Sequence, residues 1–254
     1  MSEKLLIQAQ HLHRYFSKYH AVNNLSITLY KGEVLGLLGQ NGAGKSTIMQ
    51  LLTGNLMPRS GSIVINNINL QEQPIAAKQQ LGYLPETPPL YRDMRVLEYL
   101  RYCGLLHDIP KAALKDAVNK VMHRCGLQAI QQRIIANLSK GYQQRVGIAQ
   151  AIIHEPAVII LDEPTVGLDP IQIQEIRCLI KELAQDHSVL LSTHILQEVE
   201  ALCDRVHIIS QGKTVFVDTL DALKRYQPND IDTPVCNSLE NIFTALVSQT
   251  ITSP

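Results

Sequence analysis

The chain has 254 residues, of which 45% are hydrophobic, so it is long enough to bury the core of one large α/β domain. Its 23 Lys and Arg balance its 23 Asp and Glu, which argues against nucleic-acid binding and against disorder. No apolar run approaches the roughly 18 residues of a membrane span, and the start lacks a signal-peptide layout. The five cysteines have neither CxxC nor metal-ligand spacing. These features predict a soluble, non-secreted protein of a reducing compartment.

Strands and helices alternate along the first part of the chain. We expect strands at 25–30, 34–38 and 81–84, a helix at 46–53 that ends at Gly54, and a hairpin of 62–65 with 68–70. From about Val96 to Ile135 the pattern is that of amphipathic helices. We therefore expect a helical subdomain, at about residues 87–154, inserted into the sheet-forming sequence.

The alternation resumes after this helical subdomain. We expect a helix after Ser139, strands at 157–161 and 189–191, helices from Pro170 and at 195–202, and a hairpin of 206–209 with 214–217. Residues 227–237 are typical of a linker, and Ser238 is the expected cap of a short amphipathic helix that packs on the domain. The pattern predicts an α/β fold with a mostly parallel sheet in residues 1–226, then a linker and a helix in residues 227–254.

A phosphate-binding motif follows the predicted strand at 34–38. The segment Gly39-Gln40-Asn41-Gly42-Ala43-Gly44-Lys45-Ser46 fits GxxxxGK[ST] and precedes a predicted helix, as this motif requires. Its glycines let backbone N–H groups surround phosphate oxygens at the positive end of a helix dipole. We expect Lys45 to reach the β- and γ-phosphates, Ser46 to bind Mg²⁺ and Thr47 to contact the α-phosphate. The same reasoning makes Lys45 unimportant for the stability of the nucleotide-free chain.

A second motif places two acids at the end of a buried strand. Five apolar residues, 157–161, run into Asp162 and Glu163. Because ligands of open α/β sheets bind at the carboxyl ends of the strands, both side chains are candidates for the same site. We expect Asp162 to hold Mg²⁺ through water and Glu163 to act as general base towards the attacking water. A pair of solvated acids that closes a strand is the alternative interpretation.

Between these motifs lies Leu138-Ser139-Lys140-Gly141-Tyr142, which resembles the signature of the ABC ATPases, usually LSGGQ. Further matches stand in the order that the family has: an aromatic near Phe16, the loop 83–86, Gly167-Leu168-Asp169 and Ser192-Thr193-His194. Residues 82–91 and the signature are similar to those of bacterial ABC-2-type exporter ATPases, including gliding-motility-like ones.

The resemblance implies a P-loop NTPase core with N-terminal antiparallel β elements and an inserted helical subdomain. It implies an ATP-binding and ATP-hydrolysing subunit of an ABC transporter that uses Mg²⁺ and powers export through a separate integral membrane subunit. It also implies pairing with a second copy or a paralogous ATPase chain, and a peripheral place on the cytoplasmic face of the inner membrane. No nucleic acid is expected as a partner.

Roles for single residues follow from the same resemblance. Lys45, Glu163 and His194 are the expected catalytic residues, with His194 as the γ-phosphate sensor. Ser139, Gly141 and Asp169 are expected to contact the nucleotide held by the partner chain. Phe16 is favoured over Tyr15 as the ring that stacks on adenine.

The sequence departs from the family at two places. Lys140 and Tyr142 stand where the signature usually has Gly and Gln, and Glu86 stands where the family has a glutamine. A carboxylate is a good Mg²⁺ ligand, so Glu86 either binds the metal or links the site to the membrane subunit. Two other classes remain open: a soluble ABC ATPase that acts on a macromolecular complex, and an unrelated P-loop kinase or GTPase.

Overall fold

The computed structural model describes residues 4–226 and 239–251, and it contains two sheets. The larger sheet has six strands in the order β10-β9-β3-β8-β7-β6, and all neighbours are parallel except β10 and β9. Its strands are β3 (Val34–Leu38), β6 (Leu81–Leu84), β7 (Val158–Asp162), β8 (Ser188–Thr193), β9 (Arg205–Ser210) and β10 (Lys213–Thr219). The mostly parallel α/β sheet that the sequence predicts is therefore confirmed.

The smaller sheet is antiparallel and has the order β2-β1-β4-β5. Its strands are β1 (Leu5–Phe16), β2 (Tyr19–Tyr30), β4 (Ser60–Ile65) and β5 (Ile68–Asn69). The expected hairpin of β4 and β5 is confirmed, with Asn66 and Asn67 both at positive φ. The expected antiparallel elements near the N-terminus are confirmed as well.

Side chains alternate across the buried strand β3 and connect two hydrophobic clusters. Leu35 and Leu37 pack towards the antiparallel sheet and helix α1 (Lys45–Leu52), whereas Val34 and Leu38 face the opposite cluster. That opposite cluster contains α6 (Pro170–Leu183) and α7 (Leu196–Leu202). The central strands are thus covered on both faces, so β3 is wholly apolar and β7 is apolar up to Asp162 at its carboxyl end.

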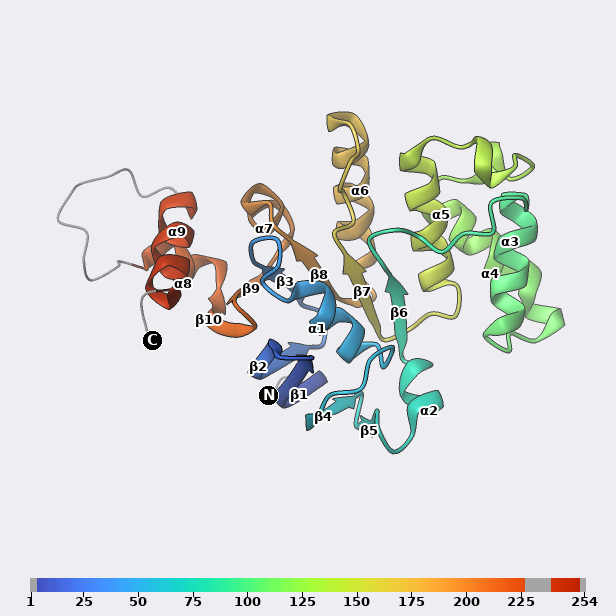
Figure 1. Ribbon diagram of the computed structural model, residues 1–254. Coiled ribbons are helices and arrows are strands. Elements are labelled where there is room, and N and C mark those ends of the chain that lie inside the picture. The colour runs from blue at the N-terminus through green and yellow to red at the C-terminus, as the bar shows by residue number, and fades with distance from the viewer. Residues whose placement is uncertain (1–3, 227–238, 252–254) are drawn as a thin grey trace.

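The helical subdomain follows β6 and returns to β7, and in Figure 1 it stands to one side of the sheet. Its helices are α3 (Val96–Leu106), α4 (Lys111–Arg124) and α5 (Lys140–Ile152), with short 3₁₀ turns at Gln128–Ile130 and Ile135–Asn137. The predicted apolar face of α4 is confirmed, because Leu114, Val118 and Val121 are buried. Ser139 caps α5 as predicted, since its hydroxyl accepts a hydrogen bond from the Tyr142 N–H.

The C-terminal helix packs on the far end of the molecule from the helical subdomain (Figure 1). Helix α9 (Leu239–Ile251) buries Leu239, Ile242, Leu246 and Val247 in the same cluster as β9 and α8 (Leu220–Arg225). The expected packed helix is confirmed, whereas its cap Ser238 and the linker 227–237 lie outside the described residues. Among the residues described, no helix combines the length and the hydrophobicity needed to cross a bilayer.

Sequence reasoning missed β1 and the first six residues of β2, 19–24. Strand β1 breaks the two-residue alternation, because His11 takes φ 50° and the pairing register shifts around it. In β2, Asn24 has φ 51° and interrupts the pattern in the same way. Bulges of this kind move side chains between faces, so the strand loses the periodicity by which it is predicted. Helices α2 (Pro74–Lys78) and α8 were missed because they span less than two turns.

Candidate nucleotide site

The loop between β3 and α1 forms a cradle of backbone N–H groups. Gly42 has φ 81° and Gly44 has φ 107°, and a Cβ at Gly44 would lie 2.7 Å from the Ala21 carbonyl oxygen. Only glycine fits that position. The N–H groups of Asn41, Gly42 and Gly44 have no hydrogen-bond partner within the described chain. Unpaired donors at a helix N-terminus suit an anion with several oxygens, such as a phosphate chain.

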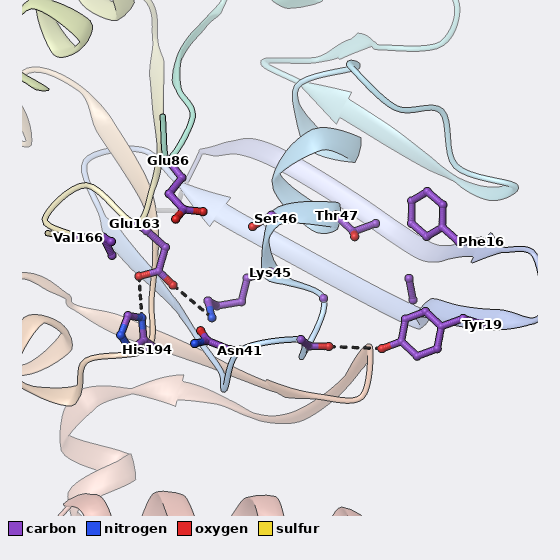
Figure 2. A pocket seen from close by; sticks show the side chains of 13 residues that line it. Phe16, Tyr19, Asn41, Lys45, Ser46, Thr47, Glu86, Glu163, Val166 and His194 are labelled. Carbon is purple, nitrogen blue, oxygen red and sulfur yellow. Dashed lines mark hydrogen bonds and ion pairs between the residues drawn. The ribbon is translucent and has the colours of Figure 1, made fainter. Parts of the chain in front are cut away.

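Lys45 is the cation of this cradle, and it is 94% buried by its own loop. Its Nζ donates to the carbonyl oxygens of Gly39 at 2.8 Å and Gln40 at 3.3 Å, and it lies 3.2 Å from Glu163 Oε1. Figure 2 shows Lys45 pointing from the start of α1 towards the end of β7. Only 6% of Lys45 is exposed, so acceptors of the protein itself hold its amine. The oxygens of a bound phosphate can replace these acceptors.

Asp162 ends β7 and Glu163 follows it, close to where the sequence predicts them, and Ser192 of β8 holds both. Ser192 Oγ donates to Asp162 Oδ1 at 2.5 Å and accepts from the Glu163 N–H at 2.9 Å. Glu163 takes φ 49°, a conformation that costs a non-glycine residue about 1–3 kcal/mol and is common at functional sites. This turn directs the Glu163 carboxylate into the site and leaves Asp162 beneath it.

Burial raises the pKa of Asp162 above its ordinary value. The hydroxyls of Ser192 and Ser46 act in the opposite direction, while the nearby carboxylates Glu163 and Glu86 add to the rise. Asp162 therefore lies beside Ser46 in a place with an excess of negative charge. A divalent cation would relieve that excess, so the side chains fit Mg²⁺.

His194 completes a chain of polar contacts across the site. Its Nδ1 lies 2.9 Å from Glu163 Oε2, so one carboxylate contacts Lys45 through one oxygen and His194 through the other (Figure 2). The Glu163 side chain is 8% exposed and that of His194 is 40% exposed. The histidine thus stands at the mouth of the site and the glutamate within it.

These groups line one pocket of about 540 Å³. It brings together ten of the predicted site residues: Phe16, Asn41, Gly42, Gly44, Lys45, Ser46, Thr47, Glu86, Glu163 and His194. Gly42 and Gly44 contribute backbone to the wall. Figure 2 shows Phe16 at one end of this nucleotide pocket and Glu86 at the other, which leaves room for a ring at one end and phosphates at the other.

The structure distinguishes Phe16 from Tyr15, the two candidates for the ring that stacks on adenine. Phe16 is 45% exposed and lines the pocket, whereas Tyr15 stacks on His20 with ring centroids 3.9 Å apart. Tyr19 also lines the pocket, and its hydroxyl donates to the Gly42 carbonyl oxygen at 3.3 Å. Sequence reasoning missed Tyr19 because the start of β2 was not predicted.

No metal position is complete in the protein alone. Among residues 4–226 and 239–251, no three Asp, Glu, His or Cys side chains converge on one metal ion. Glu86 is exposed at the rim, and Asp162 is buried at the base beside Ser46. This arrangement fits Mg²⁺ that takes part of its coordination from phosphates and water.

Gly39, Gln40 and Ala43 belong to the P-loop but do not line this pocket, and neither does Asp162. Three further predicted nucleotide contacts lie away from the P-loop, in the signature and in the segment 167–169. Ser139 caps α5, and Asp169 caps α6 by accepting from the N–H groups of Ile171 at 3.0 Å and Gln172 at 2.9 Å. Gly141 packs against the Gln172 side chain. The signature and the segment 167–169 therefore lie next to each other, and their roles towards a second nucleotide stay predictions.

A buried glutamate that the sequence did not point to ties the site loops together. Glu198 is 1% exposed and accepts hydrogen bonds from the hydroxyls of Thr165 and Thr193. Thr165 follows Glu163, and Thr193 precedes His194, so Glu198 fixes the two loops that carry the catalytic candidates. The only signal in the sequence is an acid in the first turn of a short helix.

A P-loop follows β3, two acids stand at the end of β7 on the other side of β8, and the helical insertion contains a helix capped by Ser139. Together these features define a P-loop nucleotide-binding core. The sequence profile of the family described as "ABC transporter" matches residues 22–166, more than half of the chain. The chain belongs to the ABC transporter ATP-binding family, whose domains in general bind and hydrolyse ATP.

Individual relatives agree with this family. The chain is 38% identical to the ABC transporter ATP-binding protein NatA of Bacillus subtilis, over 80% of this chain and 83% of that protein. It is 36% identical to the bacitracin transport ATP-binding protein BcrA of Bacillus licheniformis, over 87% and 72%. A solved structure of an ATP-binding subunit of an ABC transporter has a TM-score of 0.82 and 31% identity, and the match covers 95% of this chain and 99% of that one.

Proposed function

We propose that the chain hydrolyses ATP and thereby powers transport through a separate membrane subunit. The contact chain Lys45–Glu163–His194, inside a pocket lined by the P-loop, carries the proposal. It joins the cation that binds phosphate to a carboxylate placed to receive a proton. A simple phosphate-binding protein needs the first of these groups but not the second.

The ion pair suggests how each side chain acts. When the phosphates of ATP attract Lys45, Glu163 loses its cation and becomes a better proton acceptor for a water beside the γ-phosphate. His194 Nδ1 keeps the Glu163 carboxylate oriented through its second oxygen. Ser192 holds Asp162 and the Glu163 backbone at fixed positions. Mg²⁺, held by Ser46, Asp162 and Glu86, would neutralise charge on the phosphates.

A second chain is part of the proposal. Ser139 and Gly141 stand at the start of α5, and Ser139 is exposed, so this helix end is free to meet the nucleotide of another copy or a paralogous chain. Asp169 lies on the adjacent loop. Two chains that each carry one pocket and one signature can close on two nucleotides with two-fold symmetry.

The membrane subunit is assigned a groove of about 610 Å³ between the core and the helical subdomain, which we name the docking groove. Its polar lining comes from Gln50, Thr53, Asn55, Lys78, His107, Gln150 and His154. Tyr83 and Pro85 line this groove, and Glu86 of the same loop lines the nucleotide pocket. The loop 83–86 thus connects the nucleotide pocket to the docking groove. The likeness to BcrA, whose name states bacitracin transport, supports a role in transport. Export, and a place at the cytoplasmic face, remain what the sequence resemblance implies.

The test uses Glu163→Gln, which removes the base and preserves the length of the side chain. We expect ATP hydrolysis to fall about 10²–10⁴-fold while ATP binding persists. Unhydrolysed ATP should then hold two chains together, which size-exclusion chromatography with ATP detects. Glu200→Gln is the matched control, because Glu200 is an exposed glutamate without an ion pair in the described chain. Normal hydrolysis by Glu163→Gln, together with a monomer under every nucleotide condition, would overturn the proposal.

A further inference from the structure

The charges of the chain cancel overall but not locally. The helical subdomain, residues 87–154, contains ten Lys and Arg but only four Asp and Glu, an excess of six positive charges. The remaining sequence carries the same excess of negative charge, because the whole chain is neutral. A separation of this size creates a field that draws anions to one end of the molecule.

Part of this charge surrounds a groove of about 310 Å³ between α3 and α4, which we name the α3–α4 groove. Arg101 of α3 and Lys111 and Lys115 of α4 line it, and all three side chains are exposed. In the described part of the chain none of them has an ion-pair partner. Other cations of the subdomain do have one: Lys120 pairs with Glu155, and Arg145 pairs with Glu175. The groove therefore holds three cations whose counter-charge is external to the described chain.

The floor of the α3–α4 groove is apolar. Leu114 is 6% exposed and Val118 is 1% exposed, and Leu97 packs partly buried against the same cluster. One turn beyond Arg101, Leu105 and Leu106 are 47% and 64% exposed. A ligand that suits this surface has a negative group for the rim and methylene groups for the floor and for the two leucines.

We propose that the α3–α4 groove binds the phosphate headgroup of an anionic phospholipid. Arg101, Lys111 and Lys115 contact the phosphate and its neighbours, while Leu105 and Leu106 enter the edge of the acyl region. The proposal rests on the proposed function only in placing the helical subdomain beside a bilayer. The exposed leucines favour a lipid over a soluble acidic protein, because they offer nothing to an acidic side chain.

The acidic residues of the subdomain do not neutralise the three cations at the rim of the α3–α4 groove. Glu98 pairs with Arg95 on α3, and neither residue lines the groove. Asp108 lies in the turn between α3 and α4, and Asp116 follows Lys115 on α4, but neither is part of the lining. The three cations thus face the groove without a carboxylate among the residues that line it.

The experiment is sedimentation of the purified full chain with vesicles of phosphatidylcholine alone and with about one third phosphatidylglycerol. Each basic residue near an anionic surface contributes about fivefold, so three should give on the order of 100-fold between the two vesicles. The variant Arg101→Glu/Lys111→Glu/Lys115→Glu should lose that preference. The matched control Lys31→Glu/Lys181→Glu/Lys224→Glu changes the charge equally at exposed lysines elsewhere and should keep it.

Further variants and competitors distinguish a lipid site from other causes of vesicle binding. ATP binding by the triple variant should equal that of the parent, which shows that it folds and leaves the proposed function untouched. Leu105→Ser/Leu106→Ser should weaken binding to anionic vesicles while the rim is intact. Equal loss in the control triple, full competition by millimolar inorganic phosphate or polyglutamate, or no preference for phosphatidylglycerol by the parent would each overturn the lipid site.

Discussion

The nucleotide pocket and the docking groove lie on opposite sides of the loop 83–86, and they differ in charge. The pocket gathers one buried cation, Lys45, with Glu163, Glu86 and the nearby Asp162. The docking groove is lined mostly by amides, hydroxyls and two stacked histidines, with Lys78 as its one charged lining residue among those described. Burial lowers the pKa of His154 to about 4, and it lowers the pKa of His107 as well, so both rings are neutral at pH 7.

This difference indicates what each surface can hold. Ions and phosphates need fixed charges that exchange partners, as Lys45 does between Glu163 and a nucleotide. A protein segment needs hydrogen bonds and shape, and a fixed charge without a partner would penalise its burial. The pocket therefore suits a reaction and the groove suits docking.

The largest effect is expected from Lys45→Ala. Among the described residues Lys45 is the only lysine that lines the pocket, so its loss should weaken ATP binding by at least about 100-fold. It should also destabilise the nucleotide-free chain by roughly 3 kcal/mol, because Glu163 stays buried after its cation is gone. The buried ion pair thus argues against the sequence-based expectation that Lys45 is unimportant for stability. Isothermal titration and urea denaturation measure both quantities, with Lys31→Ala as the exposed control. An unchanged unfolding midpoint would remove the ion pair from the stability of the pocket.

The pocket could be predicted from the sequence because its residues stand in short contiguous motifs. Residues 39–47, 162–163 and 194 each follow a buried parallel strand, and parallel strands deliver their ends to one edge. What the sequence could not give is the partner of each side chain. The hydrogen bond from Ser192 to Asp162 and the hydrogen bonds from two threonines to Glu198 have no sequence pattern by which they could be predicted.

The sequence resemblance pointed to the helical subdomain and the loop of Glu86 as the surface that docks on the membrane subunit, but it did not predict the residues that line the docking groove. Its lining comes from one or two residues each of α1, α2, β6 and α5 and from the loops that follow α1, β6, α3 and α5, separated by up to about a hundred positions. Such a surface is set by how the helical subdomain packs on the core, and no local propensity encodes that packing. The subdomain itself was predictable, because α4 has a regular apolar stripe, whereas the concave surface beside it was not.

Ser192→Ala tests whether the pocket needs its acids held in place. The change leaves the Asp162 carboxylate without its 2.5 Å hydrogen bond in a buried site, which costs about 1.5–3 kcal/mol. We expect kcat to fall about tenfold or more with little change in the ATP dissociation constant, since Ser192 does not line the pocket. Ser192→Thr keeps the hydroxyl and should retain most of the activity. A change in KM alone, or equal losses in both variants, would assign Ser192 a packing role only.

Glu86 stands between the two regions, so its variants test their connection. Glu86→Ala should reduce the basal ATPase of the isolated chain only modestly, because Glu86 lies at the rim of the pocket. Stimulation by the membrane subunit in liposomes should disappear. Glu86→Gln keeps an oxygen donor and should retain that stimulation. ATPase assays with and without the reconstituted partner compare the three proteins. Equal stimulation of Glu86→Ala and the parent would show that Glu86 does not couple the nucleotide pocket to the membrane subunit.

The smallest effect is expected in the docking groove, from His154→Gln. His154 Nε2 contacts the Leu81 carbonyl oxygen at 2.9 Å, and its ring stacks on His107 with centroids 3.8 Å apart. Its pKa is about 4 in the folded chain against an ordinary value of 6.5, so between these values the unfolded chain binds more protons. Stability from this residue is therefore complete above pH 6.5 and is lost as the pH falls towards 4. Between pH 7 and pH 5 the parent should lose roughly 1 kcal/mol of its free energy of unfolding through this group, after allowance for screening by solvent.

His154→Gln keeps an N–H donor for the Leu81 carbonyl and should reduce that pH-dependent loss of stability. His123→Gln, at an exposed histidine of α4, should not reduce it. Urea midpoints at the two pH values measure it. A slope that is the same in all three proteins would mean that the groove is not held neutral by these rings, and the contrast with the charged pocket would then rest on its amides alone.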